Sequence, residues 1–195
     1  MEEYLKEYKA FCRSISLKNF YSHWEIQEDL CEVKEKSSSI DVFDYRCTIK
    51  IDGESSKMIL RSFFSEDLLW AIGKKALSWE KNLTDEMCLS LFEEFNNVMG
   101  ASFKRSLEEV DCLDLKVPQA KLMGNEKAFL TSENKGQELI KKKDLYILKD
   151  EWEVISDYGN LLMTLRTEIL DADRFQQANF NTTDIHSNQG EAFFL

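Results

Sequence analysis

The sequence predicts one α+β domain, with a mostly antiparallel sheet packed against a long helix and shorter helices. Strand-like segments with alternating apolar and polar residues occur in pairs separated by turn residues, which is typical of hairpins. Helical patterns lie before and between these pairs. The chain has 195 residues, 43% of them hydrophobic and 12% aromatic, which is enough for one domain with a substantial core.

Turn and capping residues mark where the predicted elements begin and end. Asp52-Gly53 is a strong hairpin signal, and Ser65 and Thr84 are each followed by two acidic residues, as at helix starts. Pro118 favours an edge strand or a bulge, because proline cannot donate a ladder hydrogen bond. The expected elements, in chain order, are a helix over 2–15, strands over 43–51 and 56–64, helices over 67–79 and 84–109, and strands over 112–124, 144–156 and 161–170.

Polar segments set the limits of the predicted domain. We expect a single domain over residues 1–170, with a long insertion at about 125–143 that is polar and rich in lysine near its end. An Asn/Gln-rich C-terminal extension follows over 171–195. Residues 157–160 form a plausible turn between the last two strands.

Composition excludes several classes of function. The net charge of −11 and the pI near 4.8 disfavour nucleic acid and anionic membranes as partners. No apolar run approaches the ~20 residues of a membrane helix, and the charged start does not resemble a secretory signal. The cysteines lack any CxxC pair, so we expect free thiols in the cytoplasm and no metal site. They are Cys12, Cys31, Cys47, Cys88 and Cys112.

The helix over 84–108 carries an unusual polar line. Its apolar stripe is predicted to centre on Met87, Leu91, Phe95, Val98 and Ser102, widened by Phe92, Met99 and Phe103. Glu93, Asn96 and Gly100 then fall together away from the centre of that stripe. Asn and Gly are poor helix formers, so the line is either tolerant surface or a face that a partner approaches.

A neighbouring carboxylate and carboxamide have a specific chemical use. The carboxylate can hold a cation, and the amide can both donate and accept hydrogen bonds, so it can orient a water molecule. Glutamine orients the attacking water in this way in some GTPases. Glu94 and Asn97 repeat the same spacing one residue later. Because their face is less consistent with Gly100, we take them as flanking surface, although the register could be one residue off.

The pattern Glu93-x-x-Asn96-x-x-x-Gly100 resembles the signature helix of the CheC/CheX/FliY phosphatases of bacterial chemotaxis. The similarity covers roughly residues 38–170, including the preceding hairpin and the following segment from Leu115 through Pro118 to Gly124. It implies a CheC-like fold and hydrolysis of the phosphoaspartate of a CheY-type response regulator.

The resemblance also implies roles for individual residues. Glu93 would contact the lysine of the receiver domain, and Asn96 would orient the attacking water. From their places on the helix, and not from the resemblance, we expect Asn97, Gly100 and Lys104 to contact the partner. The chain needs no cofactor or metal of its own, because Mg²⁺ and the phosphoaspartate belong to the receiver.

The number of signature helices indicates which members of the CheC/CheX/FliY family the chain resembles most. Only one such helix is found, whereas CheC and FliY types carry two, so the chain is closest to CheX-like proteins, which have one site and form homodimers. The alternative is a non-catalytic binding or assembly module, as the related middle domain of FliM suggests. A CheX-like domain of another signalling system also remains open.

Overall fold

The computed structural model describes residues 2–36, 40–107, 114–123, 138–142, 145–178 and 180. Its centre is a seven-stranded sheet with strand order β1-β6-β7-β3-β2-β4, in which β5 pairs with β6 and every pairing is antiparallel. The α+β prediction is therefore confirmed. The strands are β1 (Cys31–Glu35), β2 (Tyr45–Asp52), β3 (Ser56–Phe64), β4 (Asp114–Leu122), β5 (Glu138–Lys142), β6 (Leu145–Ser156) and β7 (Gly159–Ile169).

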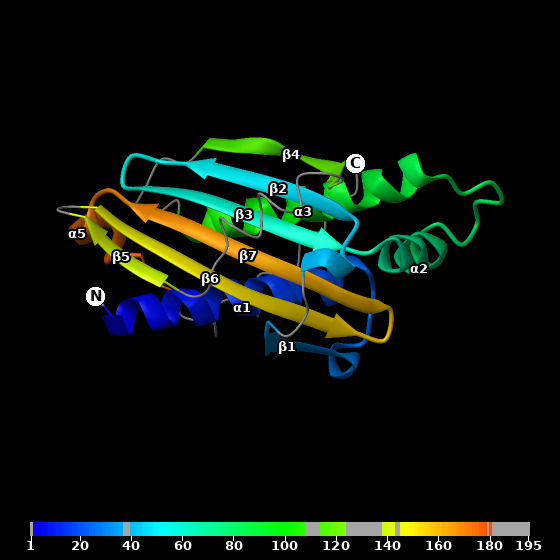
Figure 1. Ribbon diagram of the computed structural model, residues 1–195, viewed down its shortest axis with the longest axis horizontal. Coiled ribbons are helices and arrows are strands. Elements are labelled where there is room, and N and C mark those ends of the chain that lie inside the picture. The colour runs from blue at the N-terminus through cyan, green and yellow to red at the C-terminus, as the bar shows by residue number, and fades with distance from the viewer. Residues whose placement is uncertain are drawn as a thin grey trace.

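Two long helices cover one face of this sheet (Figure 1). The helices are α1 (Glu2–His23), α2 (Glu66–Ala76), α3 (Asp85–Leu107) and the short α5 (Ala172–Phe175), with 3-10 turns η1 (Glu28–Leu30) and η2 (Ile40–Val42). In the figure, α1 and α3 lie behind the sheet and α2 lies at one end. No described helix is long and apolar enough to cross a membrane.

Several elements differ from the expectation, and α2 ends at Ala76, three residues before the predicted end. The first helix continues to His23, because Ile15, Phe20 and other apolar residues keep facing the core beyond residue 15. The region before residue 36 contains β1, and the predicted insertion contains β5. The rest of that insertion, residues 125–137 and 143, lies outside the described residues.

The hairpins and caps follow the predicted signals. Asp52 ends β2, and the Gly53 amide donates to the Ser56 carbonyl at 2.8 Å. The Ser65 hydroxyl accepts from the Leu68 amide at 3.2 Å and caps α2. Gly159, the first residue of β7, directly follows the turn after β6 and has φ +130°, a conformation that favours glycine.

The prediction for Pro118 is also confirmed. The residue lies in β4, which ends the described strand order and pairs only with β2 among the described strands. The β2–β4 register shifts between Thr48 and Lys50, opposite the proline. The missing N–H is therefore placed at a bulge in an edge strand, where no continuous ladder is required.

The main core lies between the sheet and the two long helices. Alternate residues of the central strands point into it, including Leu60 and Phe64 of β3 and Leu161, Met163 and Leu165 of β7. A smaller cluster on the opposite face contains Ile40, Phe43, Phe63, Met123 and Leu162.

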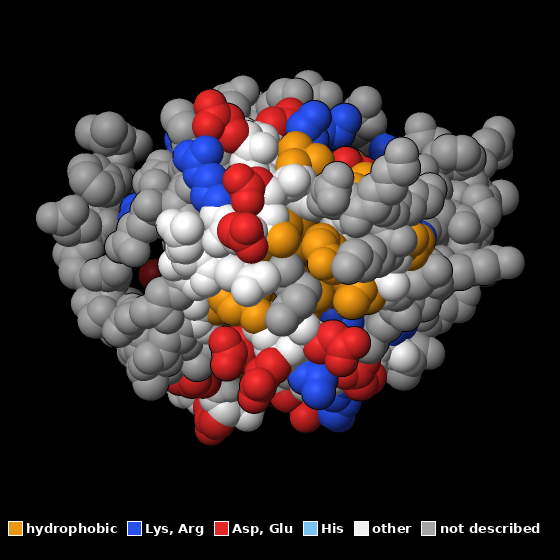
Figure 2. Space-filling view, turned by 90° about the vertical axis from the view of Figure 1, so that its left-hand side faces the viewer, with side chains coloured by type: hydrophobic (Ala, Val, Ile, Leu, Met, Phe, Trp, Pro, Cys, Tyr) orange, Lys and Arg blue, Asp and Glu red, His pale blue; other side chains and the backbone are white. Residues whose placement is uncertain are grey.

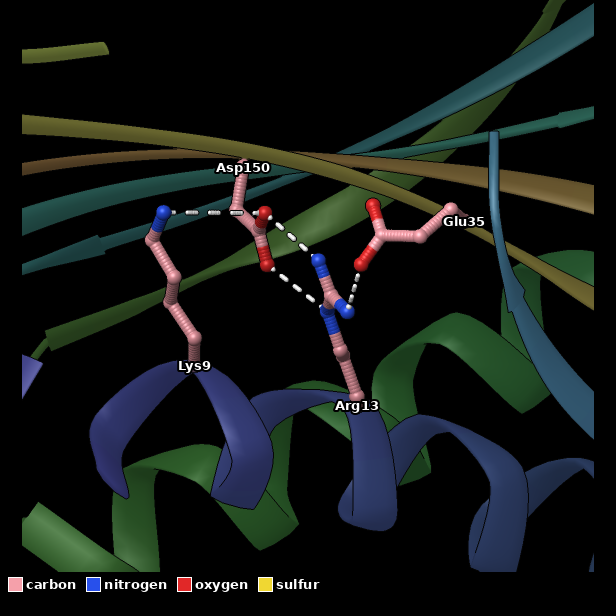
Figure 3. A network of polar contacts seen from close by, with 4 residues as sticks. All are labelled: Lys9, Arg13, Glu35 and Asp150. Atoms are coloured by element: carbon pink, nitrogen blue, oxygen red, sulfur yellow. Dashed lines mark hydrogen bonds and ion pairs between the residues drawn. The ribbon is translucent and has the colours of Figure 1, made fainter. Parts of the chain in front are cut away.

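A polar network fixes α1 to the sheet (Figure 3). The Arg13 guanidinium donates to both carboxylate oxygens of the fully buried Asp150 on β6, each at 2.9 Å, and to Glu35 of β1 at 2.6 Å. Lys9 lies 3.9 Å from the same Asp150 carboxylate. Two parallel hydrogen bonds orient the guanidinium, so α1 has a defined position on the sheet.

The start of the C-terminal extension packs against α1. The Tyr4 hydroxyl lies within hydrogen-bond distance of the carbonyl oxygens of Phe175 and Ala178, and the Phe180 ring lies 4.8 Å from that of Tyr8. Figure 2 looks onto this end of the molecule, where hydrophobic side chains are flanked by acidic ones. Residues 172–178 and Phe180 therefore pack with the domain, while 179 and 181–195 lie outside the described residues.

Candidate functional site on helix α3

The ends of α3 match the sequence signals. The Thr84 hydroxyl accepts from the Met87 amide at 3.3 Å, so it is the predicted cap. Asp85 and Glu86 occupy the first turn, and Lys104 and Arg105 occupy the last, as the helix dipole favours.

The inner face of α3 is its aromatic stripe. We define the inner face by its fully buried members, Cys88, Phe92, Phe95, Asn96, Met99 and Phe103. Phe92 stacks on Phe64 of β3 with ring centroids 4.1 Å apart, and Phe95 meets Phe20 of α1 at 6.1 Å. The helix is thus held between the sheet and α1. The predicted stripe was centred too far to one side, because Val98 is 36% exposed.

Asn96 belongs to this inner face, so the expectation that it lies on an approachable face is wrong. Its side chain is 0% exposed. Its amide oxygen accepts from the Ser62 hydroxyl at 2.8 Å, and its amide nitrogen donates to the Phe92 carbonyl at 2.7 Å. These bonds satisfy a polar group that burial would otherwise penalise. In this structure the amide of Asn96 has no access to a partner.

Glu93 and Gly100 also turn toward the interior. Glu93 is half-buried, and its charge adds to burial in raising the pKa of the Cys47 thiol on β2 to about 12. Gly100 is buried, so its backbone does not form an approachable surface. Lys104 is half-buried. The predicted line is therefore buried at Asn96 and Gly100 and only partly exposed at Glu93.

The opposite side of α3 is exposed. We define the outer face as Ser90, Glu94, Asn97 and Ala101, which follow one another by four, three and four residues and are all exposed. Residues three and four apart are neighbours on a helix, so the Glu94 carboxylate and the Asn97 carboxamide lie side by side. Asn97 was predicted as a partner contact, and its exposure is compatible with that role.

One side chain from α1 borders the outer face. His23, the last residue of α1, is half-buried, and its ring lies 5.7 Å from that of Phe95. Burial lowers the pKa of His23, and the Glu94 carboxylate acts in the opposite direction. Among the described residues, no group of three or more His, Cys, Asp or Glu side chains is placed to hold a metal ion.

Comparison with known proteins gives structural matches alone. The sequence matches no protein-family model and no curated protein. Its structure is similar to a CheC-like superfamily protein from Shewanella sp. PV-4, with a TM-score of 0.56 and 19% identity, covering 83% of this chain and 96% of that one. It is also similar to CheX in the CheX–CheY–BeF3–Mg²⁺ complex of Borrelia burgdorferi, with a TM-score of 0.58 and 15% identity, covering 85% and 97%.

The chain has the CheC-like fold. The predicted fold is therefore confirmed. The middle domain of FliM from H. pylori is similar as well, with a TM-score of 0.53 and 10% identity over 91% of this chain and 98% of that one. The CheC-like fold is thus shared by a protein seen with CheY and by a FliM domain, and the fold does not choose between them.

The sequence contained a pattern from which the outer face of α3 in this CheC-like domain could be identified. Cys88, Phe92, Phe95, Met99 and Phe103 follow one another by three or four residues and are the helix's largest continuous apolar stripe. When a helical projection of residues 84–108 is centred on this stripe, Asn96 lies within the stripe, and Glu94 and Asn97 lie on the opposite side. Aromatic side chains should weigh most in such a choice, because each buries 150–250 Å².

Proposed function

We propose that this protein is a phosphatase that hydrolyses the phosphoaspartate of a CheY-type receiver domain through the outer face of α3. Asn97 orients the attacking water, and Glu94 contacts the receiver's lysine. The observation that carries the proposal is the exposed carboxylate–carboxamide pair of Glu94 and Asn97, since in the neighbouring pair Glu93 is half-buried and Asn96 is fully buried. The similarity to CheX in a complex with CheY supports the choice of partner.

The geometry suits catalysis by positioning. The Asn97 oxygen accepts a hydrogen bond from a water molecule. This bond orients the water so that a lone pair of the water oxygen points at phosphorus, on the side opposite the aspartyl oxygen. Attack forms the new P–O bond as the bond to the aspartyl oxygen breaks, giving inorganic phosphate and a free carboxylate, and the proton of the water passes to solvent or phosphate. Mg²⁺ is expected on the receiver. A helix that holds one water in line can account for a large part of the acceleration.

Phosphate release from CheY of Borrelia burgdorferi, charged with acetyl phosphate, tests the proposal. We expect Asn97→Ala to lower the added rate about 10²–10³-fold, the typical cost of one lost positioning or charge-stabilising group. Asn96→Ala is the matched control, because it removes the same amide one residue earlier. Equal rates for wild type and Asn97→Ala, with loss only in an Asn96→Ala protein that circular dichroism shows to be folded, would return the catalytic role to Asn96.

A FliM-like binding module is the second candidate, favoured by the match over 91% of this chain to the FliM middle domain. It predicts that the protein binds a receiver or another partner without accelerating phosphate release. Homodimer formation and a cytoplasmic location belong to the same phosphatase proposal. Light scattering of the purified protein tests the dimer, and a monomer at all concentrations would contradict it.

A further inference from the structure

The end of α1 is fixed against the helix that carries the outer face. The Ser102 hydroxyl of α3 lies 3.2 Å from the Asn19 side-chain oxygen of α1, and the ring of Phe20 meets that of Phe95. One turn later, Trp24 is 4% exposed and packs on Phe92 and Phe95 with ring centroids 5.4 and 5.6 Å apart. The last turn of α1 therefore has a defined position beside Glu94 and its neighbours.

The backbone after α1 adds to this fixed position. Glu25 has φ +50°, and the Ile26 amide donates to the Tyr21 carbonyl at 2.9 Å, which is the pattern of a left-handed helix end. His23 thus has a constrained backbone, and its ring stacks edge-on against Trp24 at 4.5 Å. The imidazole is held at the border of the outer face.

A carboxylate of α3 acts on the charge of His23. From α3, Glu94 is the carboxylate that interacts with the imidazole, while Phe95 and Trp24 contribute uncharged surface. Exposed Glu25 follows two residues later along the chain. Burial is the larger influence and lowers the pKa of His23, so burial favours the neutral ring and leaves the charge of Glu94 available to a partner.

We propose that His23 is a positioning residue of the outer face, whose protonation offsets the charge that Glu94 presents to a cationic group of the docked partner. This inference rests on the proposed function for the identity of the partner. With neutral His23, Glu94 attracts the partner's ammonium group. With protonated His23, an imidazolium stands beside Glu94 and competes with that group, so docking weakens as the pH falls.

Linkage gives the proposal a reciprocal consequence. If protonation of His23 weakens docking, docking must make His23 harder to protonate by the same factor. Replacement of Glu94 by Gln removes the attraction for the imidazolium, so it must also lower the pKa of His23. Both effects are measurable on His23 itself.

The first experiment follows the histidine by NMR without a receiver. The chain has two histidines, so a His186→Asn variant leaves His23 as the single imidazole signal. We expect Glu94→Gln to lower its titration midpoint, and Glu86→Gln, an exposed carboxylate two turns away on α3, to leave it unchanged. An unchanged midpoint in Glu94→Gln would overturn the inference and leave the phosphatase proposal standing.

The second experiment measures binding of BeF3-treated CheY from Borrelia burgdorferi between pH 7.5 and pH 5.5. We expect wild type to lose about two- to fivefold more affinity than His23→Gln, the range of an exposed charge pair. Because both proteins are measured with the same receiver, any effect of pH on the receiver itself is the same in the two measurements. Equal losses would overturn the inference. Absence of binding at every pH would overturn it together with the phosphatase proposal, while binding without phosphate release would contradict the phosphatase proposal alone.

Discussion

The two faces of α3 place the same chemical group in opposite settings. Asn96 and Asn97 are adjacent, yet one amide is fully buried with two protein partners, and the other is exposed beside a carboxylate. On the inner face an amide contributes to stability, whereas on the outer face it can act on a partner. A spacing pattern in a sequence does not distinguish these settings, because the same step of three residues occurs on both faces.

The largest expected effect is on the inner face, in Phe92→Ala. The ring is fully buried and contacts Phe64, Trp24 and Phe95, so its removal leaves a cavity where the sheet, α1 and α3 meet. We expect a loss of about 3–5 kcal/mol in the free energy of unfolding, measured by urea denaturation. A loss below 1 kcal/mol would show that the two faces are not distinguished by packing.

Asn96→Ala sharpens the comparison directly. It leaves the buried Ser62 hydroxyl without its acceptor, and we expect a loss of about 1–3 kcal/mol in stability. The double variant with Ser62→Ala should lose less than the sum of the two single changes, because both lose the same hydrogen bond. Additive losses would contradict the pairing.

Gly73→Ala tests the contact of α2 with the inner face. A Cβ atom at Gly73 would overlap the Cys88 sulfur and lie 3.3 Å from a Leu83 methyl carbon, so the Cys88 side chain or the helices must shift. We expect a loss of about 1–2 kcal/mol, overpacking partly offset by the better helix propensity of alanine. The double variant of Gly73→Ala with Cys88→Ala should recover part of this lost stability. Greater stability in Gly73→Ala alone would exclude the tight contact.

The dependence of stability on alkaline pH tests whether the Cys47 thiol of β2, below Glu93, is shielded from water. Burial, with the charge of Glu93, raises the pKa of the Cys47 thiol to about 12, above its value in the unfolded chain. The stability that this group contributes is complete below the unfolded pKa and is lost as the pH rises toward the folded one. We expect wild type to lose about 1–2 kcal/mol more than Cys47→Ala between pH 7 and pH 10. Parallel pH profiles of the two proteins would contradict this.

The smallest expected effect on stability is that of Asn97→Ala on the outer face. Its side chain is exposed, so we expect the free energy of unfolding to change by no more than about 0.5 kcal/mol. Set beside the predicted loss of phosphate release, this result would separate catalysis from folding. A large loss of stability would instead make Asn97 a structural residue, and the two faces would no longer differ in kind.

Much of the fold could be predicted because its signals are local. The Asp52-Gly53 turn, the caps at Ser65 and Thr84 and the bulge at Pro118 each depend on backbone chemistry within a few residues. The full length of α1 and the presence of β1 were not predicted. Residues 16–23 gain stability mainly from packing on α3 and the sheet, and β1 gains it by pairing with β6, more than a hundred residues later in the chain.

By itself, the sequence determined the CheC-like order of elements and a long helix with two E-x-x-N pairs. The aromatic stripe of α3 indicates which pair is buried. Only the tertiary structure supplies the groups that receive that face, Ser62 and Phe64 of β3 and Trp24 after α1, because they are distant in sequence. Burial of the aromatic rings sets the rotation of α3 about its own axis, because it contributes more free energy than the hydrogen bonds of one asparagine. The nearest hydroxyl then satisfies Asn96, and Glu94 with Asn97 is left outside.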